Sequence, residues 1–499
     1  MRRSALATAA LLTVLATNGL AATFHADSPF IRDSAGRAVF FHGANAVWKV
    51  KTPTAYYPPS SVYPPPFTAD PSQSYFDDRD GTFLAENGFN VIRLGVLFVG
   101  VEPERGRFDE AYLDRIENLV DMLARHGVTV LLDFHQDMYN EKYQGEGFPD
   151  WAVIDDGLPP QNPTLGFPLN YFTPAVMRAF DNLWFDRDGL VGEYRKAWAH
   201  VAARFRSKPN VLGYDLFNEP WPGTQWETCA NPLGCPLFDG LFLQPFYERV
   251  IRGVRRARSD AIIWWAPNSI NNFGAANGVG LLHPIRDRGH NQGLAFHAYC
   301  LLGGTVPGLS RGDDPVCPTM EQLAFQRQTE AAARNRSATL LTEFGASDDL
   351  VDIGRVATLA DENMVSWIYW QYGSWSDPTG NPSEEAFFAH DLQRFDSAGA
   401  PQGLKPKADI LFRTYPQAVA GTPASFAFDS ASKAFSLEYQ ADETITAPTI
   451  VFVPVDRQYG GSYVASVDGP AEIVSTPNAP LLLVENLGSG KVTVEVKKP

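Results

Sequence analysis

The feature that most constrains this chain is a recurrence of short strand-like segments, rich in β-branched and aromatic residues, between stretches of helical periodicity. Eight strand candidates can be placed, at residues 39–44, 90–96, 128–134, 211–217, 261–266, 293–297, 338–342 and 365–370. Between the second and third, Leu113, Ile116, Val120 and Leu123 recur at helical spacing. Eight strand and helix alternations predict a (β/α)8 TIM barrel, whose active site lies at the C-terminal ends of the strands.

Composition changes near Gly421. All 11 Trp, 9 His and 4 Cys residues precede it, and the remaining residues read as short alternating segments separated by turn formers. This pattern predicts a small antiparallel β-sandwich without catalytic residues. We therefore expect a barrel domain over residues 22–420 and a sandwich domain over residues 421–499.

The first residues are typical of a secretory signal peptide. Arg2 and Arg3 precede an apolar run over residues 5–16 and a small-residue site that ends at Ala21. We expect residues 1–21 to be a signal peptide and the protein to be secreted. No later stretch is long and apolar enough for a transmembrane helix. A net charge of −16 without any cluster of Lys and Arg makes nucleic acid and anionic membranes unsuitable partners.

The cysteines are Cys229, Cys235, Cys300 and Cys317, which allow three connectivities. Export favours pairing, and we expect Cys229 to pair with Cys235 and Cys300 with Cys317, each bridge closing a loop rich in Pro and Gly. Unpaired buried thiols are the alternative. No Cys-x-x-Cys or His-x-x-x-His spacing occurs, so we expect no metal site.

Polar side chains gather where the predicted strands end. They are Arg93, His135, Asp137, Asn218, Glu219, His297, Tyr299, Glu343 and Trp370. Glu219 and Glu343 follow strands four and seven, which face each other across a barrel mouth. Cleavage of a glycosidic bond needs a proton donor and a carboxylate facing the anomeric carbon, and carboxyl groups ~5 Å apart give retention of configuration. The alternative for each glutamate alone is a helix cap or a salt bridge.

These residues resemble the pattern of the retaining glycoside hydrolases of family 5, over about residues 35–415. The segment His42-Gly43-Ala44-Asn45-Ala46-Val47-Trp48-Lys49 and the run Phe134-His135-Gln136-Asp137 are similar to the endoglycoceramidases, although these more often have valine where Ala44 stands. The resemblance implies that Glu219 is the acid/base and Glu343 the nucleophile. The residues alone identify the two glutamates, but they do not show which is the acid/base and which is the nucleophile. We expect the pKa of Glu219 to be raised by the nearby Glu343.

The other residues have roles around this pair. Arg93 would orient the nucleophile, Tyr299 would donate to the same carboxylate, and His297 would support the site. Asn218 would reach a sugar 2-hydroxyl, and Trp370 would offer a flat apolar face to the sugar. Lys49, His135 and Asp137 would bind sugar hydroxyls. The alternatives are a cap for Asn218, barrel filling for Trp370 and a solvated side chain for Lys49; His42 reads as a core histidine.

The leading hypothesis is a secreted endo-β-glycosidase that separates oligosaccharide from the ceramide of glycosphingolipids, by double displacement and without a cofactor. Apolar loops after strands one and three, at about residues 48–75 and 148–172, suit a substrate with a lipid end; the alternative is that they pack on the barrel. Other candidate functions are an endogalactosylceramidase, a β-glucanase or β-glucosidase, and a catalytically silent glycolipid-binding protein. A need for detergent or an activator protein stays open.

Overall fold

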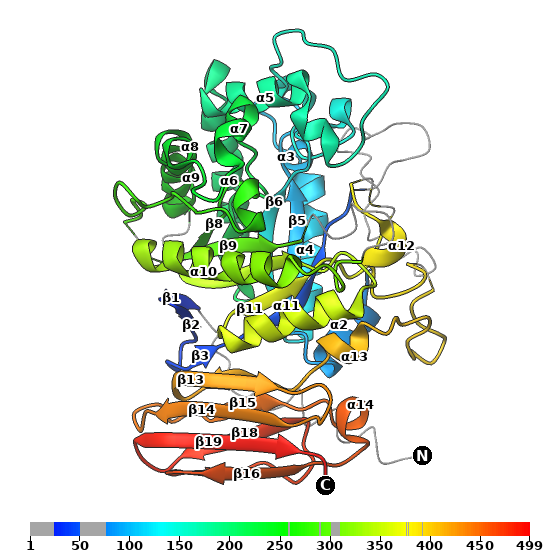
Figure 1. Ribbon diagram of the computed structural model, residues 1–499, viewed down its shortest axis with the longest axis vertical. Coiled ribbons are helices and arrows are strands. Elements are labelled where there is room, and N and C mark those ends of the chain that lie inside the picture. Colours follow the sequence, from blue (N-terminus) through cyan, green and yellow to red (C-terminus); the bar gives the residue numbers. More distant parts are fainter. Residues whose placement is uncertain are drawn as a thin grey trace.

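The protein is a closed eight-stranded parallel barrel with antiparallel sheets at one end, as expected (Figure 1). The computed structural model describes residues 24–49, 76–257, 260–288, 291–300, 310–375, 377, 379–391 and 393–499. The expected signal peptide and most of the first apolar loop, residues 50–75, lie outside these ranges. The barrel strands are β4 (His42–Ala46), β5 (Val91–Leu97), β6 (Thr129–His135), β7 (Val211–Asp215), β8 (Ile262–Trp265), β9 (Gln292–Ala298), β10 (Ala338–Phe344) and β11 (Ser366–Tyr369).

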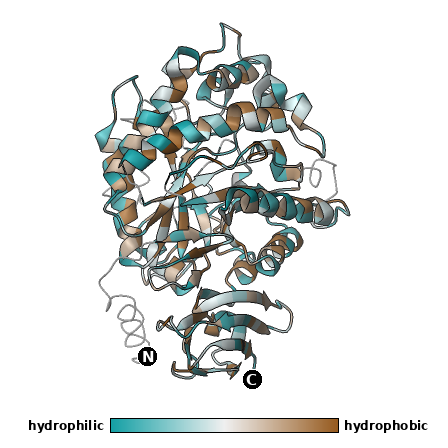
Figure 2. Cartoon of the chain, turned by 90° about the vertical axis from the view of Figure 1, so that its left-hand side faces the viewer, coloured by the Kyte–Doolittle hydropathy of each residue, from teal (hydrophilic) through white to brown (hydrophobic). Residues whose placement is uncertain are grey.

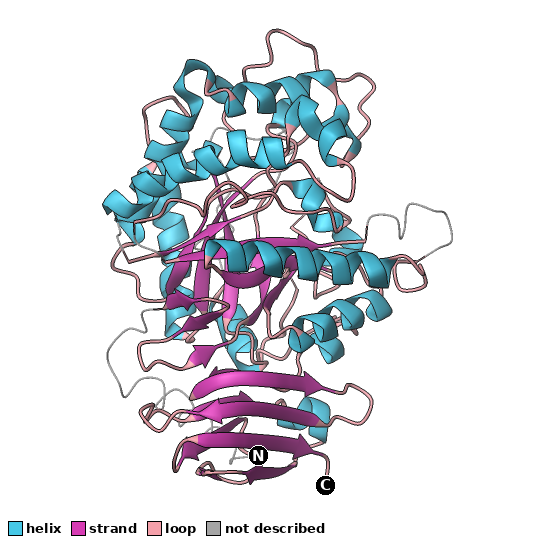
Figure 3. Ribbon diagram, turned by 60° about the vertical axis from the view of Figure 1, so that its left-hand side comes forward, coloured by secondary structure: helices cyan, strands magenta, loops and turns pink. Residues whose placement is uncertain are grey.

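Helices surround the barrel (Figure 3). Their buried apolar residues belong to the same core cluster as those of the barrel strands. In Figure 2 they carry both brown and teal residues, as amphipathic helices do. The longer ones are α2 (Asp78–Glu86), α4 (Glu110–Arg125), α5 (Pro174–Trp184), α6 (Leu190–Phe205), α9 (Gln244–Ala257), α10 (Cys317–Asn335) and α11 (Leu350–Glu362). Within the described residues between β8 and β9, the only helical segment is the short 3₁₀ turn η9 (Ser269–Phe273), so the alternation is less regular than expected.

Short helical turns occupy the connections. They are α3 (Phe98–Val101), η3 (Glu141–Tyr143), η4 (Asp150–Ala152), η5 (Leu169–Phe172), η6 (Arg187–Gly189), η7 (Gly223–Gln225), α7 (Trp226–Cys229), α8 (Pro236–Phe238), η8 (Asp239–Leu243), α12 (Pro382–Glu385), α13 (Ala408–Leu411) and α14 (Val455–Tyr459). Among the described helices, none combines the length and the apolar character that crossing a bilayer would require.

The first predicted strand proves to be two strands in different sheets. Residues 38–39 form β3 (Ala38–Val39), which pairs with β12 (Tyr415–Val419) of the tail, and the barrel strand β4 begins only at His42. The pairing partner of Val39 is Ala418, almost the whole chain away. Local periodicity carries no information about so distant a pairing partner. The prediction from sequence therefore joined the two strands into one.

The C-terminal part is a pair of antiparallel sheets, seen at the lower end of Figure 1. One sheet contains β1 (His25–Asp27), β2 (Phe30–Arg32), β3, β12, β15 (Thr449–Phe452), β18 (Leu481–Asn486) and β17 (Ala471–Ile473). The other contains β13 (Gly421–Phe428), β14 (Phe435–Ala441), β19 (Gly490–Lys497) and β16 (Val464–Asp468). The sandwich therefore takes strands from both ends of the described chain, beyond the range 421–499 expected from composition.

Barrel and sandwich meet through a buried contact. His42 stacks between Trp367 and Tyr415, with ring centroids 4.0 Å and 3.6 Å away, as a core histidine. Gly88 has φ of +78°, and a Cβ there would lie 2.3 Å from the Phe452 ring, so only glycine fits the close approach. The sandwich thus packs directly on the barrel floor, opposite the catalytic mouth.

Two disulfides tie connections together in the pairing expected from sequence. Cys229 bonds to Cys235 and Cys300 to Cys317. The first lies between α7 and α8, after β7, and the second joins the end of β9 to the start of α10. Both lie in connections that follow barrel strands.

Candidate active site

Glu219 and Glu343 face each other at the barrel mouth. Glu343 lies in β10, and Glu219 follows the end of β7 by four residues. One carboxylate oxygen of each and a ring nitrogen of His297 all lie within 4.8 Å of one another. This agrees with the separation of ~5 Å expected for a retaining pair, which leaves no room for a water molecule between carboxylate and sugar.

Glu343 is held by cationic and neutral donors. Arg93 donates from Nη1 to Oε1 at 2.6 Å, and the Tyr299 hydroxyl donates to Oε2 at 3.1 Å. Burial raises the pKa of Glu343, while His297 and Arg93 oppose that shift. A guanidinium at hydrogen-bond distance stabilises the anion, which is the form that a nucleophile needs.

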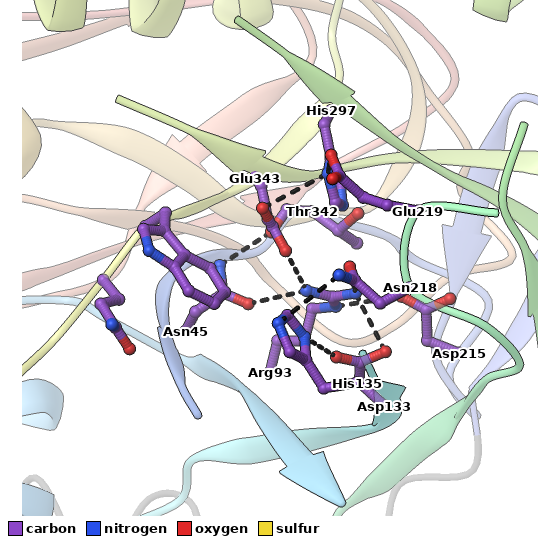
Figure 4. Close-up of polar contacts among 12 residues, drawn as sticks. Asn45, Arg93, Asp133, His135, Asp215, Asn218, Glu219, His297, Thr342 and Glu343 are labelled. Carbon is purple, nitrogen blue, oxygen red and sulfur yellow. Dashed lines mark hydrogen bonds and ion pairs between the residues drawn. The ribbon is translucent and has the colours of Figure 1, made fainter. Parts of the chain in front are cut away.

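Arg93 lies at the centre of the network and is fully buried (Figure 4). It comes from β5 and contacts four other chain segments. Besides Glu343 its partners are Asp215 at 3.0 Å, Asp133 at 3.0 Å, Asn218 at 2.8 Å and Asn45 at 3.1 Å. Because so many donors are engaged, Arg93 is locked in one position and fixes the Glu343 carboxylate.

Among the residues that the structure describes, neutral groups contact the Glu219 carboxylate. Asn272 of η9 donates to Oε1 at 3.1 Å, and His297 Nδ1 lies 2.8 Å from the same oxygen. Burial raises the pKa of Glu219 to about 7, with a further contribution from Asp137. Burial is thus the main cause, rather than the neighbouring Glu343 that the sequence suggested. The carboxyl with neutral donors retains its proton to a higher pH than the one bonded to Arg93.

His297 contacts both glutamates (Figure 4). Its Nδ1 is 2.8 Å from Glu219 and 3.3 Å from Glu343. Burial lowers the pKa of His297 to about 4, against the opposing effect of Glu343. The ring is therefore neutral near pH 7, and its Nδ1–H can bridge the pair without adding a charge.

The turn that carries Glu219 is strained. Glu219 has φ of +46° immediately before Pro220, a conformation that costs non-glycine residues about 1–3 kcal/mol. The Gln136 amide donates to the carbonyl oxygens of Asn218 and Glu219, at 2.9 Å and 3.1 Å. Asn218 in turn donates to the Gln136 carbonyl at 3.0 Å, so the cap expected as its alternative role is not its function here.

Lys49, His135, Asp137 and Trp370 form a second group beside the pair. Lys49 Nζ lies 2.6 Å from Asp137 and 4.6 Å from the Trp370 ring centroid, and the lysine is 1% exposed. This excludes the solvated side chain that was the alternative for Lys49. The His135 ring stacks on Trp370, with centroids 5.1 Å apart, and Asp133 Oδ2 accepts from its Nδ1–H at 2.8 Å. Although burial and Lys49 oppose it, Asp133 and Asp137 raise the pKa of His135 to about 9.

The structure adds residues that the sequence interpretation missed: Asn45, Asp133, Gln136, Asp215 and Asn272. Asp133 could have been found, because it lies two residues before His135 on the same face of one strand. Asn45 and Gln136 stood in the segments quoted for the resemblance but were given no role. Nothing local marks Asn272, which reaches Glu219 from η9.

The apolar loop after β6 is divided. Phe148 is buried and stacks on Tyr139, with centroids 4.1 Å apart. Leu165, Phe167, Leu169 and Phe172 are 40–53% exposed. The part of the loop around Phe148 is therefore packed on the barrel, as the alternative interpretation predicted. The part from Leu165 to Phe172 is available to solvent or ligand.

Comparison with known proteins agrees with this geometry. Residues 70–376 match the model of cellulase (glycosyl hydrolase family 5), and residues 413–496 match the glycoside hydrolase family 5 C-terminal domain. Endoglycoceramidase I of Rhodococcus hoagii is 32% identical, over 96% of this chain and 88% of its own.

Solved structures of endo-glycoceramidase II from Rhodococcus sp. are also similar. Its lactosyl-enzyme intermediate superposes with a TM-score of 0.74 and 29% identity, covering 94% of this chain and 99% of that one. Its complex with ganglioside GM3 has a TM-score of 0.72 and 28% identity, with the same coverage. The chain belongs to glycosyl hydrolase family 5, and within it to the endoglycoceramidases.

Proposed function

We propose that this protein is a secreted enzyme that hydrolyses the β-glycosidic bond between oligosaccharide and ceramide of glycosphingolipids, with retention of configuration. The observation that carries the proposal is the pair of carboxylates, Glu219 and Glu343, within 4.8 Å of each other at the barrel mouth. Membership of the endoglycoceramidases and the GM3 and lactosyl complexes of the Rhodococcus enzyme support the substrate class.

The first step forms a covalent intermediate. The Glu343 carboxylate attacks the anomeric carbon while the bond to the ceramide oxygen breaks, and protonated Glu219 gives its proton to that oxygen. Arg93 and Tyr299 hold Glu343 in line for attack. Arg93 donates a hydrogen bond to one oxygen of the Glu343 carboxylate and Tyr299 donates one to the other. The carboxylate therefore cannot rotate away from the sugar.

The second step releases the sugar. Water enters where ceramide has left, ionised Glu219 removes its proton, and the resulting nucleophile attacks the anomeric carbon from the opposite face to the ester bond. Glu343 leaves as a carboxylate and Glu219 is again protonated. The two carboxyl groups supply acid, base and nucleophile, so this mechanism uses no metal or organic cofactor.

Sugar binding belongs to Asn218 and to the second group of residues. Asn218, which accepts from Arg93 at 2.8 Å, binds the sugar 2-hydroxyl, a contact that strengthens in the transition state. Trp370 offers its face to the sugar, and Lys49, His135 and Asp137 bind hydroxyls at the edge of the sugar. Secretion rests on the N-terminal sequence, and detection of a mature chain that begins near Ala22 in the medium of expressing cells would test it.

The substrate is tested by side-by-side assays of a glucosyl-linked ganglioside, a galactosyl-linked glycolipid and a soluble β-glucan, each with and without detergent. We expect intact oligosaccharide and free ceramide from the ganglioside. Preferential cleavage of the galactosyl lipid would identify an endogalactosylceramidase instead, and cleavage of the glucan alone would reject a lipid substrate. Binding of ganglioside without any hydrolysis would identify a glycolipid-binding protein. Activity that appears only with detergent would indicate a need for substrate dispersal or an activator.

A further inference from the structure

The segment that follows β11 brings a set of buried polar side chains to the sugar-binding group. Asp377, Thr379 and Glu385 are 4%, 3% and 0% exposed, and the proposed mechanism gives them no role. Gly380 lies so close to Glu385 that a Cβ there would meet Oε2 at 2.3 Å. This packing keeps the Glu385 carboxylate against the barrel mouth.

Two of these residues contact Lys49. Its Nζ lies 2.8 Å from Thr379 Oγ1 and 3.2 Å from Asp377 Oδ2, in addition to Asp137. Thr379 Oγ1 is also 3.0 Å from Asp137 Oδ2 and 2.8 Å from Asp377 Oδ1. We call Lys49, Asp137, Glu146, Asp377 and Thr379 the lysine cage; Glu146 Oε1 completes it at 3.3 Å from Nζ.

The third residue contacts Trp370. The indole Nε1–H donates to Glu385 Oε2 at 3.1 Å, and Gln371 joins Glu385 to Asp377 with bonds of 3.3 Å and 3.1 Å. The indole ring therefore has its edge fixed by Glu385, one face near His135, and Lys49 within 4.6 Å of its centroid.

Stability alone does not account for this arrangement. Lys49 lies within 3.3 Å of three buried carboxylates, from Asp137, Glu146 and Asp377, and the buried Glu385 carboxylate is joined to Asp377 through the Gln371 amide. Desolvation of buried ion pairs offsets most of their attraction, so apolar residues of similar volume would stabilise the fold as well. What such a network does supply is fixed geometry, because each side chain has several partners.

We propose that Asp377, Thr379 and Glu385 are positioning residues of the glycosidase site: Asp377 and Thr379 hold Lys49, and Glu385 holds the Trp370 ring, so that both present fixed surfaces to the sugar being cleaved. The inference rests on the proposed function, in which Lys49 and Trp370 bind that sugar. Because the sugar occupies the same place in both chemical steps, loss of a positioning residue slows formation and hydrolysis of the glycosyl-enzyme alike.

The test compares Glu385→Leu, Glu385→Gln, Asp377→Asn and Thr379→Val on an activated aryl β-lactoside. The fraction of competent sites is counted by mass-spectrometric labelling with a fluorinated lactosyl inactivator. Per competent site, Glu385→Leu should lose about 10- to 100-fold in kcat/KM, the range expected when a binding group is misplaced by ~1 Å. Asp377→Asn and Thr379→Val should each raise KM and lose about 10-fold. Glu385→Gln keeps an acceptor for the indole and should recover most of the loss.

Two controls separate positioning from folding. Glu384→Gln changes the exposed neighbour on the same helix α12 and should match the wild type. In a Trp370→Phe background, which lacks the indole N–H, Glu385→Leu should have little further effect. The positioning role of Glu385 is wrong if the losses in kcat/KM caused by Trp370→Phe and Glu385→Leu multiply in the double variant. It is also wrong if the per-site kcat/KM of Glu385→Leu equals that of the wild type. If Asp377→Asn and Thr379→Val alter only the competent fraction, the role of the cage is wrong.

The proposed function can fail separately. If the wild type cleaves the aryl lactoside but releases no ceramide from a ganglioside, the lipid substrate is rejected, while the positioning results on the aryl lactoside still stand.

Discussion

Two glutamates with the same intrinsic chemistry acquire different roles from the groups that touch them. Glu343 accepts from a buried guanidinium at 2.6 Å, whereas Glu219 has an amide and a neutral imidazole on its carboxylate. The cation favours ionisation of Glu343, and burial beside these neutral donors favours the protonated form of Glu219. The order of roles, which the residues alone left open, therefore has a physical basis in the structure.

The acid/base role of Glu219 is tested with Glu219→Ala. A leaving group that needs protonation should suffer about 10²- to 10⁴-fold in the first step. An activated aryl glycoside departs without a proton, so a burst of phenol should precede slow hydrolysis. Azide fills the space that the carboxylate vacated and needs no base, so it should accelerate turnover and give a β-glycosyl azide. Loss of the burst, or an α-azide product, would require the two roles to be exchanged or abandoned.

The nucleophile is tested with Glu343→Gln. The amide keeps the shape of the side chain and loses the nucleophilic oxygen anion, so substrate should bind while turnover falls to the limit of detection. Isothermal titration with a lactosyl ligand measures the first property and release of aryl alcohol the second. Azide should not restore a β-azide product in this variant, in contrast to Glu219→Ala.

The pH dependence of kcat/KM follows from the protonation state that each carboxyl needs. Glu219 must be protonated in the free enzyme, and its pKa of about 7 places the basic limb of the profile there, with activity falling as pH rises. With an activated aryl glycoside the first step needs no acid, so the basic limb near pH 7 should disappear. A limb that is identical for both leaving groups would assign it to another residue.

At the scale of elements, the sequence located every barrel strand to within a few residues, because buried parallel strands are continuous apolar runs with clear ends. It placed the barrel start wrongly at residue 39, since the partner of Val39 is Ala418. The site was predictable where a polar side chain lies on a barrel strand, as Arg93, His135 and Glu343 do. Asn272, Asp377 and Glu385 come from connections without periodicity, and their contacts depend on loop conformation that no local pattern encodes.

Helix α4 was predicted from the helical spacing of its apolar residues. Its N-terminal cap can be tested separately from the active site. Asp109 accepts from the backbone N–H of Tyr112 at 3.0 Å, satisfying one of the unpaired donors of the first turn. Asp109→Ala should lower the free energy of unfolding by about 1 kcal/mol, and Asp109→Asn by less. Urea denaturation measures both. The kcat/KM of each variant should match that of the wild type, and a loss of activity without a loss of stability would contradict a purely structural cap.

At the scale of the whole molecule, the sandwich and the barrel are packed against each other through buried residues. The strand β12 pairs on one side with β3 from the N-terminal region and on the other with β15. A stop codon after Gln417 should remove β15 with Val451 and Phe452, and should expose the apolar residues of the same cluster that remain, such as Phe40 and Tyr415, giving insoluble protein. Soluble, active protein from this truncation would show that the barrel folds independently of the sandwich.

Buried carboxyls outside the mouth give the molecule an unusual dependence of stability on pH. Asp239 is fully buried and accepts from the Asn268 amide at 2.7 Å and from the Gly278 N–H at 2.8 Å, yet burial raises its pKa to about 7. In the unfolded chain its pKa is about 3.9. Between these values the folded state binds the proton and the unfolded state does not, so the free energy of unfolding falls as pH rises.

The matched variant Asp239→Asn isolates this contribution. The wild type should lose stability between about pH 5 and pH 7, with about 2 kcal/mol of that loss due to Asp239. In Asp239→Asn, whose amide cannot ionise, the slope should be smaller by that amount, whatever the absolute stability of the variant. Urea midpoints at several pH values across this window measure the slope. Equal slopes in the two proteins would mean that Asp239 is already ionised in the folded state, held so by its two donors, and that the pH dependence arises elsewhere.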